Sequence, residues 1–184
     1  QNIEPILLRF LQEDEPASVI FGIKAALRLR APTTLPIIRK IARRAFKNAT
    51  AGDAPLLSER NAWWVQYEAL AALAQWEKGD ALPLLKRKAI EAPPVARLLG
   101  LFLWAESLPQ IAHWASGGRA DAQRAAEALN APVPAAALRA TRETMLGYLR
   151  DPKAAAELRH KLALKIGMSS TATEVGALLK EYEA

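Results

Sequence analysis

Three Leu-Pro pairs, at positions 35–36, 82–83 and 108–109, constrain the fold of this chain more than any other feature of its sequence. Each pair opens a segment with helical apolar periodicity, and each follows another apolar segment after a short turn. Proline has no N–H to lose in the first turn of a helix, whereas it costs about 3 kcal/mol in a helix interior. The Leu-Pro pairs therefore predict where the second helices of a series of helix pairs begin.

The clearest helix pair lies between Val19 and Lys47. Its first helix has an apolar stripe that includes Ile23 and Leu27, and its second helix is expected over 35–48. Eight of the twelve prolines lie at predicted helix starts, namely Pro5, Pro16, Pro36, Pro83, Pro94, Pro109, Pro134 and Pro152. Asp151 before Pro152 strengthens the last of these predictions, since Asp is a good N-cap. A capping box is predicted at Thr171 and Glu174.

Composition points to an all-α fold. Hydrophobic residues make up 51% of the 184-residue chain and charged residues 24%, which is typical of a folded domain. Much of the apolar content is Ala and Leu, which are strong helix formers. The chain has no cysteine, which excludes disulfides, thiolate metal sites and cysteine nucleophiles.

We expect one domain over residues 1–184, an α-solenoid of about five helix pairs plus a leading helix, because stacked pairs bury faces that one pair cannot. The Leu-Pro pairs are 47 and 26 residues apart, so a closed helical bundle with unequal units is the alternative. The expected units are the leading helix 2–13 and the pairs 16–48, 58–91, 93–116, 119–150 and 152–183.

The C-terminal part resembles a known repeat family. The run 147–152, followed by 157–167, is similar to the helix-turn, Asp-Pro and Val-Arg-x-x-Ala-x-x-Ala-Leu-Gly pattern of short bacterial HEAT-like repeats, with Leu158-Arg159 in place of Val-Arg. Together with the Leu-Pro pairs, the resemblance covers most of the chain, and 117–150 matches least. It implies a curved α-solenoid whose second helices line a concave face.

Basic residues gather on the predicted second helices. Like charges four residues apart on a helix repel, so such a cluster favours a partner that neutralises it, either phosphates or an acidic protein. The alternative is a solvated face in a chain of net charge +6. The candidate binding residues are Arg39, Lys40, Arg43, Arg44, Lys47, Lys86, Arg87 and Lys88.

Two adjacent tryptophans, Trp63 and Trp64, cannot both face the core of one helix. We predict that one of them is an exposed aromatic anchor for a base or a protein partner. The alternative is packing between repeats of unequal length. His113 and His160 lie in different predicted helices without ligand-spaced neighbours, so no metal site is predicted.

The expected function is a non-catalytic scaffold or adaptor that binds a protein partner on the concave face. The alternative is nucleic-acid binding through a basic groove, with an activity like that of the HEAT-like alkylpurine DNA glycosylases. We expect no cofactor. We also expect no membrane span, because the most apolar run, 98–105, is much shorter than the roughly 20 residues that a spanning helix needs. The chain opens on helix-like sequence, so we expect a fragment or a processed chain. We expect it in the cytoplasm, or in the periplasm if a leader has been removed.

Overall fold

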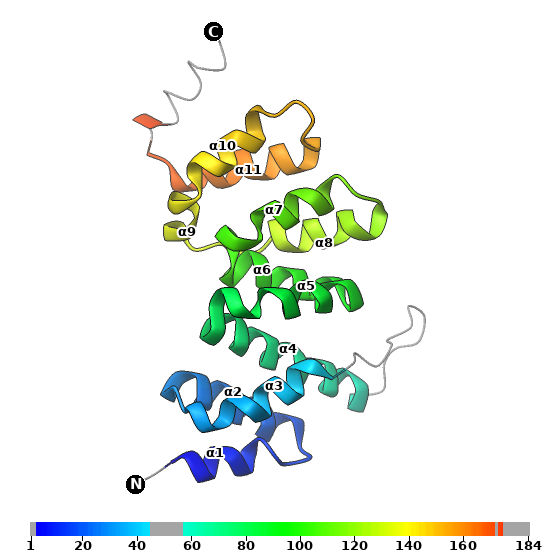
Figure 1. The fold of residues 1–184 in the computed structure, drawn as a ribbon, viewed down its shortest axis with the longest axis vertical. Coiled ribbons are helices and arrows are strands. Elements are labelled where there is room, and N and C mark those ends of the chain that lie inside the picture. Colours follow the sequence, from blue (N-terminus) through cyan, green and yellow to red (C-terminus); the bar gives the residue numbers. More distant parts are fainter. Residues whose placement is uncertain (1–2, 45–56, 172, 175–184) are drawn as a thin grey trace.

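The structure, a computed structural model, describes residues 3–44, 57–171 and 173–174. Every regular element within these ranges is a helix, which confirms the all-α prediction. The described part is elongated, with α1 (Glu4–Phe10) near one end and α11 (Ala156–Ser169) near the other (Figure 1). None of its helices is both long and apolar enough to cross a membrane.

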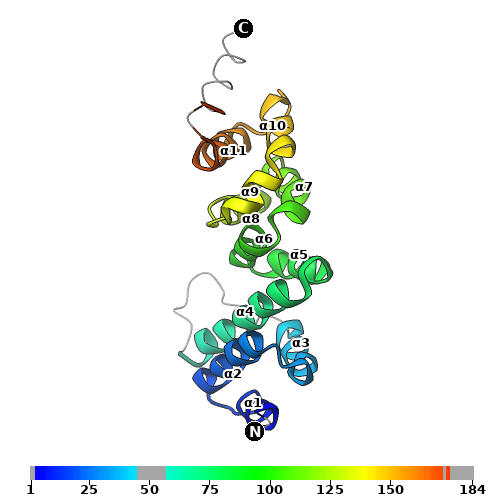
Figure 2. The same ribbon diagram turned by 90° about the vertical axis from the view of Figure 1, so that its left-hand side faces the viewer.

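Successive helices alternate between two columns (Figure 2). The first column contains α2 (Pro16–Leu29), α4 (Leu57–Glu77), α6 (Ala96–Phe102), α8 (Arg119–Leu129) and α11. The second column contains α3 (Leu35–Arg43), α5 (Leu82–Glu91), α7 (Trp104–Ala115) and α10 (Arg142–Arg150). Along the first column each helix packs on the next, from α2 through α4, α6 and α8 to α11. The helices thus form layers such as α2 with α3 and α4 with α5, with one helix from each column.

Short elements make the turns between columns. The 3-10 helices η1 (Pro32–Thr34) and η2 (Lys78–Ala81) lead directly into α3 and α5, and η3 (Pro93–Val95) leads into α6. The helix α9 (Ala135–Ala140) is separated from α10 only by Thr141. The sequence after the predicted helix start at Pro134 thus forms two short helices.

One apolar core runs through the described layers. It includes buried residues from both columns, such as Ile23, Leu70 and Leu99 in the first and Ile38 and Leu108 in the second.

The packing of α6 on α8 along this core depends on how closely the two helices can approach. A Cβ at Gly100 of α6 would overlap the carbonyl oxygen of Ala128 in α8, and glycine avoids that overlap. Gly100 therefore sets the distance between α6 and α8.

Proline marks the helix starts less completely than predicted. Pro36 and Pro83 lie in the first turns of α3 and α5, as expected, but Pro109 lies inside α7. The chain breaks instead at Leu103, where φ is −131° and ψ is 37°. Pro109 removes the hydrogen bond to the carbonyl of Ala105, and that residue is exposed, so the interruption is tolerated.

Asp151 and Pro152 form a turn and not the predicted helix start. The Asp151 carboxylate accepts a hydrogen bond from the Lys153 N–H at 2.9 Å. The backbone carbonyl of Asp151 accepts one from the Ala154 N–H at 3.1 Å. This local bonding competes with an N-cap, and α11 begins only at Ala156.

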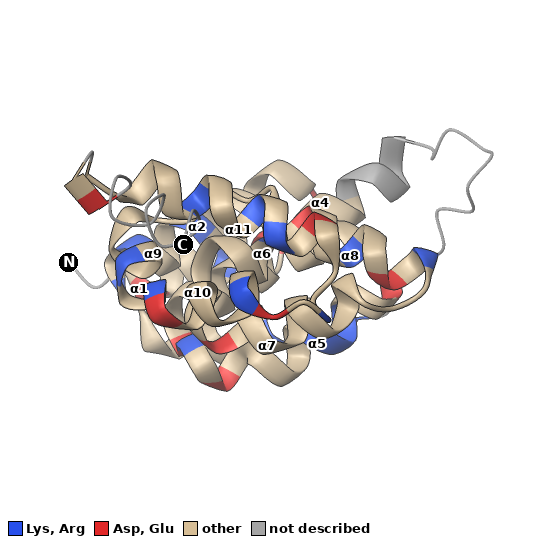
Figure 3. Ribbon diagram, turned by 90° about the horizontal axis from the view of Figure 1, so that it is seen from above, with Lys and Arg blue, Asp and Glu red and all other residues tan. Residues whose placement is uncertain are grey.

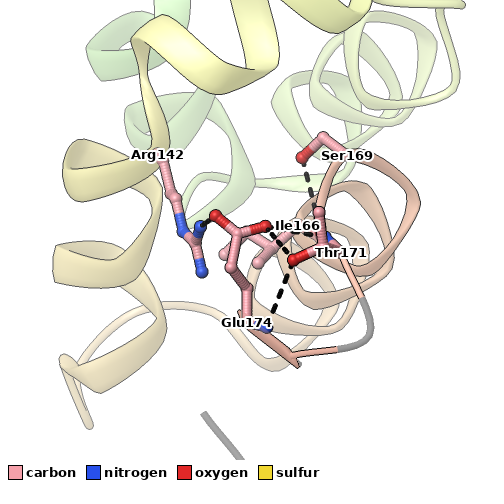
Figure 4. Close-up of polar contacts among 5 residues, drawn as sticks. All are labelled: Arg142, Ile166, Ser169, Thr171 and Glu174. Carbon is pink, nitrogen blue, oxygen red and sulfur yellow. Dashed lines mark hydrogen bonds and ion pairs between the residues drawn. The ribbon is translucent and has the colours of Figure 1, made fainter. Parts of the chain in front are cut away.

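The predicted capping box is confirmed at Thr171 and Glu174 (Figure 4). The Glu174 carboxylate accepts from the Thr171 N–H at 2.6 Å, and the Glu174 N–H donates to the Thr171 hydroxyl at 3.4 Å. Arg142 of α10 pairs with the same carboxylate. The hydrogen bond from the Thr171 N–H is the main reason that the pKa of Glu174 lies below its ordinary value.

Candidate functional site

The outer side of α3 is basic. Ile38, Ile41 and Ala42 face the core, and the opposite side carries four exposed cations, Arg39, Lys40, Arg43 and Arg44. Arg39 already has a partner, since its Nε lies 2.5 Å from Oε1 of Glu77 at the end of α4. Lys40, Arg43 and Arg44 have no ion pair with any residue that the structure describes.

The basic run on α5, coloured blue in Figure 3, divides into exposed and buried side chains. Arg87 is exposed and Lys86 is half-buried. Lys88 is only 2% exposed; its Nζ donates to the carbonyl of Arg44 and contacts the Glu91 carboxylate, both at 2.6 Å. Lys88 therefore lies away from the surface, while Lys47 falls outside the described residues. We call Lys40, Arg43, Arg44, Lys86 and Arg87 the basic face.

Aligning the three Leu-Pro pairs places the basic face in register. Four residues after the proline stand Lys40, Arg87 and His113, which are all exposed. Five residues after it stand Ile41, Lys88 and Trp114, which are all buried. The second column thus presents a basic or imidazole side chain at the same position of α3, α5 and α7.

Lys88 belongs to a second set of cations, which connect the layers. Arg124 of α8 donates through Nε to the carbonyl of Ala89 in α5 at 3.1 Å, and Lys165 of α11 donates to the carbonyl of Ala131, just after α8, at 3.0 Å. The last carbonyls of a helix have no partner within it, and cations there also favour the helix dipole. We call Lys88, Arg124 and Lys165 the seam cations.

The role of the seam cations was not predicted from the sequence, although the position of Lys88 carried a signal. It shares the inner face of α5 with Leu85 and Ala89, three positions before it and one after it. A lysine at that spacing is a candidate for burial. Arg124 and Lys165 gave no comparable signal, because the carbonyls that accept their hydrogen bonds lie 34 or more residues earlier in the chain.

The tryptophan pair lies on α4 with one ring outward. Trp64 is 46% exposed and Trp63 is half-buried, so one ring of the pair is exposed, as predicted, while its role as an anchor stays a prediction. The Trp63 ring stacks on Tyr67 with centroids 5.1 Å apart, and Trp64 meets Trp63 edge to face at 5.0 Å. Burial raises the pKa of Tyr67. This aromatic cluster belongs to the first column, whereas the basic face belongs to the second.

A metal centre has no support in the described part of the chain, where no three His, Asp or Glu side chains are grouped to hold an ion. His113 lies on α7 and His160 on α11.

Comparison with protein-family models, with curated proteins and with solved structures found no match to this chain.

Proposed function

We propose that this chain is an α-solenoid of HEAT-like helix pairs that binds an acidic segment of a partner protein on its basic face. The observation that carries the proposal is the exposure of Lys40, Arg43, Arg44 and Arg87 on neighbouring second-column helices without carboxylates to neutralise them.

The alternation of the helices between two columns supports the solenoid. The helices α2 and α3 fall within the expected pair 16–48, and α4 and α5 within 58–91. Each pair exposes its apolar sides to the layers above and below, which is the way that stacked repeats share a core. The common register of Leu-Pro in α3 and α5 agrees with repeated units.

The local charge balance supports an anionic partner. The helix α3 contains no acidic residue. Two carboxylates contact cations of α3 and α5, but both are already used in ion pairs, Glu77 with Arg39 and Glu91 with Lys88. An acidic segment laid across α3 and α5 would meet the remaining cations and relieve their mutual repulsion.

An acidic protein segment suits this surface better than a single-stranded nucleic acid. Proteins that bind single strands combine cations with aromatic rings on which bases stack. Here the exposed ring, Trp64, lies on a helix of the other column. The basic face has charges but no aromatic platform among its own residues.

The test is binding of a fluorescent glutamate-rich peptide, measured by anisotropy beside single- and double-stranded DNA of similar charge. The face variant carries Lys40→Glu, Arg43→Glu and Arg87→Glu. A matched control carries Arg119→Glu, Arg139→Glu and Lys153→Glu, which are exposed positions in later layers. Each reversal removes two charges, so both variants go from a net charge of +6 to zero.

We expect the face variant to bind the peptide about 10–100-fold more weakly, since each exposed ion pair contributes roughly 0.5–1 kcal/mol. The control should keep most of the wild-type affinity. Equal losses in both variants would show non-specific attraction and contradict the proposal. Tighter binding of DNA than of peptide, with a loss of about a thousandfold between about 50 and 200 mM salt, would favour the nucleic-acid function instead.

A further inference from the structure

A hollow of about 390 Å³ lies between α2 and α4, near the ends at which both helices finish. It is lined by Lys24, Leu27, Arg28, Arg30, Gln75 and Trp76. Its volume is within the range of small-molecule sites, roughly 300–1,000 Å³. None of its residues belongs to the basic face, so the hollow is a separate feature of the surface.

The charge of the hollow is positive. Lys24 contacts Glu68 at 3.1 Å, and that contact leaves its side chain 60% exposed. Arg28 and Arg30 are exposed and make no ion pair with a described residue. Two guanidinium groups two residues apart can take the oxygens of a phosphate in paired hydrogen bonds, which a lysine cannot do.

The backbone holds Arg30 in an unusual conformation. It is the C-cap of α2 with φ 49° and ψ 51°, in the left-handed region where glycine is the common residue. Such a conformation in a non-glycine residue is a reason to look for function at that position. Lys78, which follows α4, has φ 50°. Each of the two helices that border the hollow is therefore followed by a basic residue with a left-handed backbone conformation.

The opposite wall supplies an aromatic ring and an amide. Trp76 is half-buried and lines the hollow, as does Leu27. An indole is a stacking platform for any base. The side-chain N–H of Gln75 donates to the Ala71 carbonyl at 3.3 Å, which leaves the amide oxygen to accept from a ligand N–H.

We propose that this hollow binds a nucleotide, with the base stacked on Trp76 and the phosphates held by Arg28 and Arg30. The combination of a ring, an amide and two guanidinium groups matches both halves of such a ligand. A simple anion would use the arginines alone, and a nucleoside would use only the tryptophan.

Calorimetric titration of the intact chain with ADP, adenosine and pyrophosphate separates these possibilities. We expect ADP to bind at least tenfold more tightly than either of the other two. The double variant Arg28→Ala with Arg30→Asn should weaken ADP binding at least tenfold, and asparagine tolerates the left-handed backbone. Trp76→Phe should weaken ADP and leave pyrophosphate unchanged.

Arg87→Ala, on the basic face, is the matched control and should bind ADP like the wild type. Circular dichroism of each variant verifies that the helices are intact, which we expect because Arg28 and Arg30 are exposed. The proposal is overturned if ADP does not bind at millimolar concentration, if pyrophosphate binds as tightly as ADP, or if the double variant and Arg87→Ala behave alike. None of these results bears on peptide binding by the basic face, which uses other residues.

Discussion

The basic face and the layer seams place the same residue types in opposite environments. Arg87 and Lys88 are neighbours on α5, yet Arg87 is exposed, while Lys88 is buried against the end of α3 and the Glu91 carboxylate. An exposed cation is available to a partner, whereas a buried cation is committed to the carbonyls that surround it. Net charge therefore overstates the basic surface of this chain, because part of that charge holds the layers together.

The seam cations also differ from one another. Lys88 and Arg124 each have a carboxylate within their own helix, Glu91 and Asp121. The structure shows no carboxylate contact for Lys165 among the described residues; its Nζ lies 5.2 Å from the centre of the Trp104 ring. Burial lowers the pKa of Lys165, helped by the nearby Lys161. The charged form of Lys165 is thus less well stabilised by its surroundings than the charges of Lys88 and Arg124.

Adding one methyl group at the seam between α6 and α8 should have the largest effect on stability. Gly100→Ala forces a Cβ into the Ala128 carbonyl, so the helices must separate. We expect a loss of about 1–3 kcal/mol or more in the free energy of unfolding, measured by urea denaturation. Gly147→Ala, on α10 with open space around the new Cβ, is the control and should not destabilise the fold. Equal effects would mean that α6 and α8 are not in close contact.

Removing the best-partnered seam lysine should come next. Lys88→Met deletes the hydrogen bond to the Arg44 carbonyl and the contact with Glu91, and we expect a loss of about 1–3 kcal/mol. The neighbouring change Arg87→Met alters an exposed residue and should stay within about 0.5 kcal/mol. Both are measured by urea denaturation. Similar losses of unfolding free energy in the two variants would contradict the distinction between the basic face and the seam cations.

Lys165→Met should cost less, about 1 kcal/mol or below at neutral pH, because the buried charge it removes is poorly compensated. Its lowered pKa makes the effect depend on pH. Between that pKa and the ordinary 10.5, the unfolded chain binds more protons than the folded one, so wild-type stability gains with rising pH. The variant lacks this gain. Urea titrations across the alkaline range should show the wild type improving relative to Lys165→Met, and a constant difference would contradict the burial of this lysine.

The smallest effect on stability is expected from the face itself. The triple variant Lys40→Glu, Arg43→Glu and Arg87→Glu should unfold within about 1 kcal/mol of the wild type, because these side chains are exposed. Thermal denaturation followed by circular dichroism measures this. A loss comparable to that of Lys88→Met would place the face cations in the structural framework instead of on a binding surface.

Particular residues show how far the sequence could lead. Helix periodicity and Pro36 and Pro83 were enough to place α3 and α5, since proline in a first turn is a local preference. The prediction that Pro109 starts a helix was wrong. The Ala105 carbonyl can lose its hydrogen-bond donor at little cost because Ala105 is exposed, and that exposure depends on the tertiary structure. The basic residues of α3 were visible as a stripe, but the burial of Lys88 depends on a carbonyl 44 positions earlier in the chain. Contacts of that range are set by how layers stack, and no local pattern encodes them.

The most direct test of the basic face is a titration of isotope-labelled protein with the glutamate-rich peptide, followed by backbone amide NMR shifts. We expect the shifts to concentrate on α3 and α5, around Lys40, Arg43 and Arg87, while Arg119, Arg139 and Lys153 in later layers stay unchanged. Shifts spread evenly over exposed cations in all layers, or centred on Trp64, would contradict it.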